Sequence, residues 1–134
     1  MKHRVLHIGR WRVDCLFARD EYDIDEVLSL MDECGATPSL CDRAERLMTS
    51  GKVNTGFTFS DSDAYRAIVV VGPSSSGEQF INTLSHEIHH LAVAIASSLG
   101  VDLEGETPAY ITGDTTMELL KTICEFGCAC SIDK

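Results

Sequence analysis

The chain has 134 residues, of which 44% are hydrophobic and 24% are charged, a balance typical of one globular domain over residues 1–134. A formal net charge of −10 argues against nucleic acid as a partner, because phosphate binding requires clustered Lys and Arg. The sequence contains no run of about 18 apolar residues and no long apolar segment near its start, so we expect no membrane span and no signal peptide. We therefore expect a cytoplasmic location in which the cysteines stay reduced.

The first third of the chain predicts a strand region and two helices. Residues 5–17 are typical of β-strand with a break at 10–12, and the alternation of Trp11, Val13 and Cys15 indicates a half-buried strand. Residues 23–34 predict an amphipathic helix that Gly35 ends. Pro38 begins a second amphipathic helix, which runs to about Ser50.

The middle of the chain predicts a hairpin that leads into a long helix. The two strands of the hairpin are expected at 54–60 and 65–72. Residues 67–71 are nearly all apolar, so the second strand should be central or covered on both faces. A turn-rich loop at 72–77 then precedes a helix over 78–99.

That long helix contains the pattern His-Glu-x-x-His. His86 and His90 are four positions apart, so on a helix both imidazoles lie on one face, where they can bind one tetrahedral zinc ion at about 2.0–2.1 Å each. Glu87 lies beside them and could take a proton from a water molecule activated by the metal. The pattern predicts a metal-dependent hydrolase of the metalloprotease kind. The competing interpretation is a core helix whose histidines bond to the backbone.

A catalytic zinc ion takes three protein ligands and leaves a fourth position open. No His follows His90, so the third ligand should come from the acids downstream, which are Asp102, Glu104, Glu106, Asp114 and Glu118. We favour Glu106, because Gly100 lets a second helix fold back and Pro108 marks where that helix begins. Gly105 or Asp102 could cap this helix. The alternative is that Glu106 is only an acid at a helix start, where the positive end of the helix favours it.

The second helix is expected to run from Glu106 to about residue 126, with a weak point at Gly113. Tyr110 lies four residues after Glu106, hence on the same face of the helix. Its hydroxyl could stabilise an oxyanion or bond to a ligand carboxylate. The alternative is an aromatic side chain that packs and keeps a hydrogen-bonded tip.

The run His86-Glu87-Ile88-His89-His90, followed by Glu106-Thr107-Pro108-Ala109-Tyr110, resembles the gluzincin branch of zinc metallopeptidases. It resembles more closely a group of small proteins of phages and mobile elements that are assigned as metallopeptidases. The resemblance covers about residues 65–125 and implies His86, His90 and Glu106 as zinc ligands, with Glu87 as the general base. It also implies a peptide or protein substrate that pairs with a strand just before the active-site helix. His89 departs from the usual apolar or small residue and could compete for the metal.

The sequence therefore predicts an α+β, zincin-like fold, with a small antiparallel or mixed sheet packed against the active-site helix and a second metal-ligand helix. The predicted function is zinc-dependent hydrolysis of peptide bonds, catalysed by Glu87 with Tyr110. The alternative is a catalytically inactive zincin-like phage or mobile-element protein that binds a partner. Cys124, Cys128 and Cys130 are expected to be free thiols, the other possibility being a second metal site.

Overall fold

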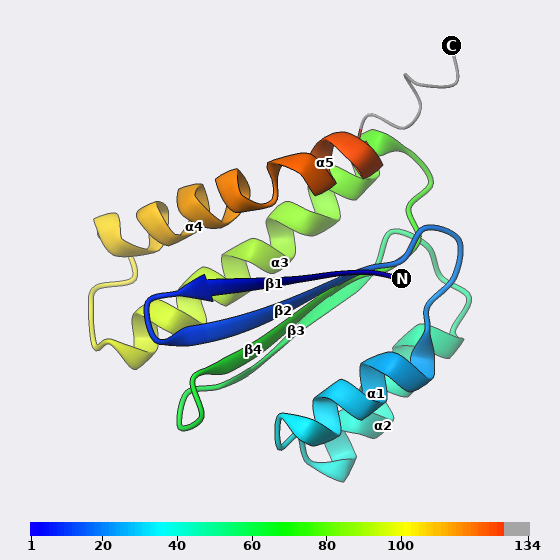
Figure 1. The fold of residues 1–134 in the computed structure, drawn as a ribbon, viewed down its shortest axis with the longest axis horizontal. Helices are drawn as coiled ribbons and strands as arrows, with labels where there is room; N and C mark the ends of the chain where they lie inside the picture. Colours follow the sequence, from blue (N-terminus) through cyan, green and yellow to red (C-terminus); the bar gives the residue numbers. More distant parts are fainter. Residues whose placement is uncertain (128–134) are drawn as a thin grey trace.

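A four-stranded mixed sheet lies between two layers of helices (Figure 1). The computed structural model describes residues 1–127 of the chain. The strands follow the spatial order β1-β2-β4-β3, in which β2 and β4 are parallel and both outer pairs are antiparallel. Their bounds are Lys2–Ile8 for β1, Trp11–Phe17 for β2, Gly56–Asp61 for β3 and Arg66–Val71 for β4. The structure thus confirms the α+β class and the mixed sheet.

A two-residue turn joins β1 to β2. Gly9 has a φ of +57°, a left-handed conformation that glycine adopts without steric cost, and Arg10 completes the turn. The expected break at 10–12 is therefore misplaced, because Trp11 and Arg12 already pair with β1. β2 is also buried on both faces and not on one, because it lies between β1 and β4 with helices on either side.

The hairpin expected between residues 54 and 72 is confirmed. β3 and β4 pair antiparallel, from Gly56 opposite Val71 to Asp61 opposite Arg66. β4 lies between β2 and β3, and residues 67–71 are all buried, as the apolar run predicts. β3 is an edge strand, whose outer backbone groups pair with no other strand of the described chain.

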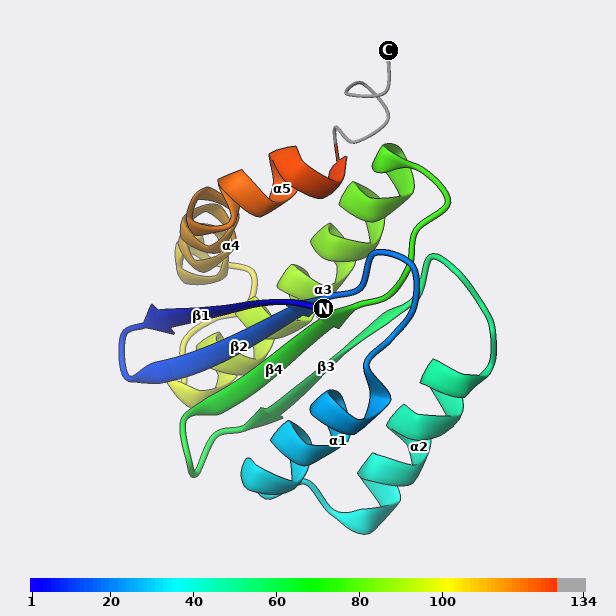
Figure 2. The same cartoon turned by 45° about the vertical axis from the view of Figure 1, so that its right-hand side comes forward.

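Two amphipathic helices cover one face of the sheet (Figure 2). Their bounds are Ile24–Glu33 for α1 and Pro38–Thr49 for α2, each within one residue of the predicted range. Asp23 and Thr37 cap them, since their side chains accept hydrogen bonds from backbone N–H groups of the first turn. The core under these helices contains the buried residues Leu16, Val27, Leu30, Met31, Cys34, Ala44, Met48, Ile68 and Val70.

Three helices cover the opposite face. Their bounds are Gly77–Ser98 for α3, Glu106–Glu118 for α4 and Leu120–Gly127 for α5. Ser76 caps α3, the long helix that carries the histidine motif. α3 packs against β3 and β4, whereas α4 packs against α3 and β1. No helix within residues 1–127 is both long and apolar enough to cross a membrane.

The helical segment after the motif bends at Leu119 and not at Gly113, where the weak point was expected. Gly113 is exposed and lies inside the regular helix α4. Leu119 is completely buried, and its N–H bonds to two carbonyl groups of the preceding turn. The bend allows α5 to pack on α3, where the ring of Phe126 stacks on that of Phe80 with centroids 5.3 Å apart.

The described cysteines are free thiols, namely Cys15, Cys34, Cys41 and Cys124. Burial raises the pKa of the Cys15 thiol to about 12, so this side chain stays protonated and serves packing. Of the three C-terminal thiols, Cys124 lies in α5, and Cys128 and Cys130 lie outside the described residues.

Candidate functional site

The two histidines of the motif converge on one point. His86 and His90 lie one turn apart on the exposed side of α3, with their Nε2 atoms 3.1 Å apart and their ring planes at 80°. Two nitrogens bound to one tetrahedral zinc ion at about 2.0–2.1 Å lie about 3.3 Å apart, so this separation fits a shared metal. Without a metal, an Nε2–H group of one ring can donate a hydrogen bond to the other ring.

Both rings face a groove between α3 and the edge strand β3. The groove consists of two pockets of about 300 and 410 Å³, which share Gly56, His86 and Glu87 in their walls. His90 borders the larger pocket together with residues of β3. The groove therefore brings the histidine pair, the motif glutamate and an open strand edge to one place.

Glu87 points into this groove from the same helix but is only 4% exposed. The hydroxyl of Thr58 on β3 lies 2.9 Å from its Oε1 atom and 3.2 Å from its backbone carbonyl oxygen. A buried carboxylate requires such a partner, because burial without a hydrogen bond is costly. The glutamate that the sequence assigns as general base is thus held beside His86.

Tyr22 lies beside the groove, and no pattern in the sequence singles it out. Its hydroxyl is within 3.0 Å of the hydroxyl of Thr55, a residue that borders the smaller pocket. Burial raises the pKa of Tyr22, the hydrogen bond with Thr55 lowers it, and the charge of Glu87 raises it, with a net increase. The phenol therefore stays protonated at neutral pH and remains a hydrogen-bond donor.

Close approach of β3 to α3 depends on Gly56. A Cβ atom at this position would lie 2.6 Å from the carbonyl oxygen of Val70 and 3.2 Å from Cγ of Glu87.

We expect Gly56→Ala to lower the free energy of unfolding by about 1–3 kcal/mol, because the strand must shift to accept the methyl group. Urea unfolding measures this change, with Gly113→Ala on the exposed side of α4 as the control. Since alanine favours a helix interior, the control should be neutral or stabilising, and an unchanged midpoint for Gly56→Ala would disprove the close contact.

The other predicted site residues lie apart from the groove. Glu106 is the first residue of α4, and Tyr110, one turn later, is 67% exposed. Neither borders the pockets beside the histidines, and His89 is exposed outside them. Within residues 1–127, no three His, Cys, Asp or Glu side chains are grouped so that they could hold a metal ion. The structure therefore brings together His86, Glu87 and His90, but does not bring Glu106 to them.

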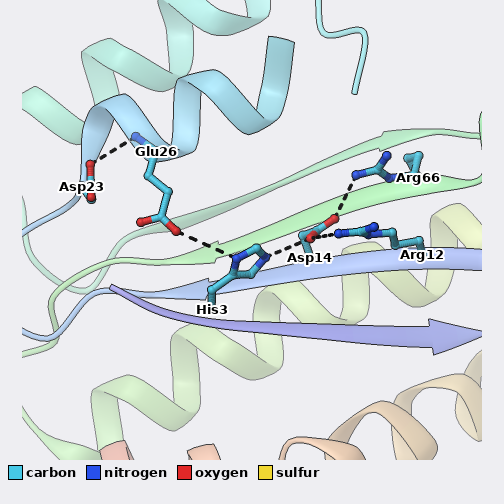
Figure 3. Close-up of polar contacts among 6 residues, drawn as sticks. All are labelled: His3, Arg12, Asp14, Asp23, Glu26 and Arg66. Atoms are coloured by element: carbon cyan, nitrogen blue, oxygen red, sulfur yellow. Dashed lines mark hydrogen bonds and ion pairs between the residues drawn. The ribbon is translucent and has the colours of Figure 1, made fainter. Parts of the chain in front are cut away.

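A second polar cluster lies on the α1 side of the sheet (Figure 3). Asp14, in the middle of β2, is 0% exposed and contacts His3 at 2.9 Å, Arg66 at 3.2 Å and Arg12 at 3.3 Å. The other ring nitrogen of His3 lies 3.9 Å from a carboxylate oxygen of Glu26 on α1. Burial alone would raise the pKa of Asp14, but these three hydrogen bonds outweigh it and hold the pKa below its ordinary value of 3.8. The cluster joins three strands and α1 through polar contacts.

Comparisons of the chain with models of known protein families, with curated protein sequences and with solved structures find no match.

Proposed function

We propose that this chain is a zinc-dependent hydrolase with a zincin-like fold that acts on peptide bonds. The observation that carries the proposal is the convergence of the His86 and His90 Nε2 atoms at 3.1 Å, in a groove that also holds the buried carboxylate of Glu87. Both rings are exposed to the groove, so a metal and a substrate can reach them. The two nitrogen donors match the preference of zinc for imidazole ligands.

The residues of the groove divide the chemistry between them. A zinc ion held by His86 and His90 would polarise the substrate carbonyl and lower the pKa of water toward about 7. Glu87 would take the proton of the attacking water and later pass a proton to the leaving nitrogen. Its place in the wall of the pocket that His86 and His90 also border supports this role, because a general base must lie within hydrogen-bond reach of the proton that it removes.

The edge strand β3 suits an extended peptide as the substrate. Its outer backbone groups are unpaired within the described chain, and its inner face borders the groove. A peptide that lies along this edge would gain main-chain hydrogen bonds, while its alternate side chains would point toward the histidines. The strand just before α3 in the sequence is β4, which is paired on both sides, so the role of pairing with a substrate would fall to β3, its partner in the hairpin.

Glu106 and Tyr110 remain the sequence-based candidates for the third ligand and for an oxyanion-stabilising hydroxyl. Both lie on the exposed first turns of α4, which packs on α3 and β1. Glu106 would reach the pair only if the start of α4 moved toward β3. A variant at Glu106 therefore tests this part of the proposal separately from the histidine pair.

The same open edge of β3 supports a second function, in which an inactive zincin-like protein binds an extended segment of a partner. Main-chain pairing with β3 would supply affinity in this case, with no need for a metal or for Glu87 as a base. The two functions differ in their requirement for zinc.

Zinc content per chain, measured by elemental analysis after reconstitution, tests the proposed function. We expect about one zinc ion in the wild type and a clear loss in His90→Ala and in Glu106→Ala. His7→Ala, which removes an exposed histidine of β1, is the matched control and should keep its zinc. Zinc retained in Glu106→Ala alone would remove that residue from the ligand set. No zinc in the wild type would refute the zinc hydrolase and favour the partner-binding function.

A further inference from the structure

Thr58 connects the edge strand to the glutamate of the motif. It lies in the middle of β3, opposite Val69 of β4, and its hydroxyl contacts Glu87 on α3. The flanking side chains of Phe57 and Phe59 pack instead in the core under α1 and α2. This alternation, which follows from the period of a strand, places Thr58 on the groove side.

The hydroxyl of Thr58 has two acceptors within reach but only one proton to donate. Oε1 of Glu87 is closer, at 2.9 Å, than the backbone carbonyl oxygen of Glu87, at 3.2 Å. Hydrogen bonds to a charged acceptor are shorter and stronger than those between neutral groups. The proton therefore goes to Oε1 of the carboxylate, and Oε2 takes no part in this bond.

A glutamate side chain has several rotatable bonds, so position on a helix alone does not orient its carboxylate. Here the partner comes from a different element, since Thr58 is 29 positions away and sits in a strand that pairs along its length with β4. Catalytic groups are most effective when a second residue on a rigid element holds them.

We propose that Thr58 is a positioning residue, which holds the Glu87 carboxylate in the orientation that a general base requires. The inference rests on the proposed function, because it assigns Thr58 a role in the same hydrolytic site. It adds that β3 contributes to the orientation of the base as well as to the wall of the groove.

Two substitutions at Thr58 and one control test the role. Thr58→Val removes the hydroxyl and keeps the size and β-branching of the side chain, and Thr58→Ser returns a hydroxyl. Thr116→Val on α4 makes the same chemical change at an exposed threonine, whose hydroxyl bonds to the carbonyl of Thr112 in its own helix.

The first measurement is thermal unfolding of the metal-free protein, which needs no activity. We expect Thr58→Val to lower the Tm by roughly 4 °C, because Glu87 loses its buried partner. In a Glu87→Ala background the same substitution should have a smaller effect, since only the bond to the backbone carbonyl oxygen of residue 87 is left to lose. Thr116→Val should change the Tm by the same amount in the wild type and in the Glu87→Ala variant.

The second measurement is hydrolysis of a quenched fluorescent peptide that the wild type cleaves. We expect Thr58→Val to lower kcat roughly 10- to 100-fold with KM nearly unchanged, and with the zinc content of the wild type. Thr58→Ser should restore most of the lost kcat. A purely structural role would not give this division between kcat and KM.

Each contrary result removes a different part of the inference. Additive effects of Thr58→Val and Glu87→Ala on the Tm would show that the two side chains do not interact. Coupled unfolding with an unchanged kcat, in an active zinc-loaded protein, would overturn the positioning role and leave the proposed function intact. A wild type with neither zinc nor hydrolysis would reject the proposed function, and the positioning role with it, whatever the unfolding data show.

Discussion

Glu87→Gln is expected to lower kcat by about 10²- to 10⁴-fold while the zinc content stays at the wild-type level. Glutamine has the shape of glutamate, and its amide oxygen can still accept the hydroxyl of Thr58, so the groove should keep its form. An amide cannot take a proton from water, however, and the general base is lost. Hydrolysis of a quenched peptide library, with elemental analysis of the same sample, measures both quantities.

Glu78→Gln provides the matched control for this substitution. It makes the same change of charge on the same helix, but Glu78 lies in the exposed first turn of α3 and borders neither pocket of the groove. Its activity should stay near that of the wild type. If Glu87→Gln retained hydrolysis, the carboxylate would not be the base and the mechanism proposed here would be wrong. If it lost zinc instead, Glu87 would be required for the metal site and not for proton transfer.

The helices and strands of this chain follow largely from local signals. Asp23, Thr37 and Ser76 each begin a helix with a side chain that accepts a backbone hydrogen bond. Gly35 and Gly51, both with positive φ, follow α1 and α2. What local signals could not give is the order of the strands, because the parallel pairing of β2 with β4 joins segments separated by two helices.

The histidine pair could be predicted from its spacing, whereas the support around Glu87 could not. His86 and His90 share a face of any α-helix, whatever the helix packs against. Thr58 and Gly56 reach Glu87 only because β3 pairs with β4 in one register and lies beside α3. A one-residue shift of that register would turn Thr58 toward α2 and away from the groove.

The position of Glu106 and Tyr110 follows from which face of α4 packs. The buried residues of this segment are Ile111, Thr115 and Leu119, spaced by four, so they form the stripe that faces the core. Glu106 and Tyr110 are also spaced by four, but they lie on a neighbouring face that this packing leaves exposed. The stripe is visible in the sequence and indicates that Glu106 and Tyr110 face solvent.

Asp14→Ala is expected to destabilise the fold by about 3 kcal/mol at neutral pH, because it leaves two arginines and a histidine without their shared buried carboxylate. For a chain of this length, such a loss lowers the Tm by roughly 10 °C. Asp20→Ala removes an exposed carboxylate soon after the same strand and is the control, with little expected change. Thermal unfolding followed by circular dichroism measures both variants.

The pH dependence of the Tm difference between wild type and Asp14→Ala tests whether the charge of Asp14 causes the loss of stability. Because the folded protein holds the pKa of Asp14 below its ordinary value of 3.8, the carboxylate stabilises the fold fully above that value. The contribution is lost as the pH falls below about 4 toward the folded pKa, where Asp14 takes up a proton and no longer pairs with Arg12 and Arg66. The Tm difference between wild type and Asp14→Ala should therefore be present in full at neutral pH and shrink below about pH 4. A difference that stayed constant down to pH 3 would attribute the loss to packing and not to the charge of Asp14.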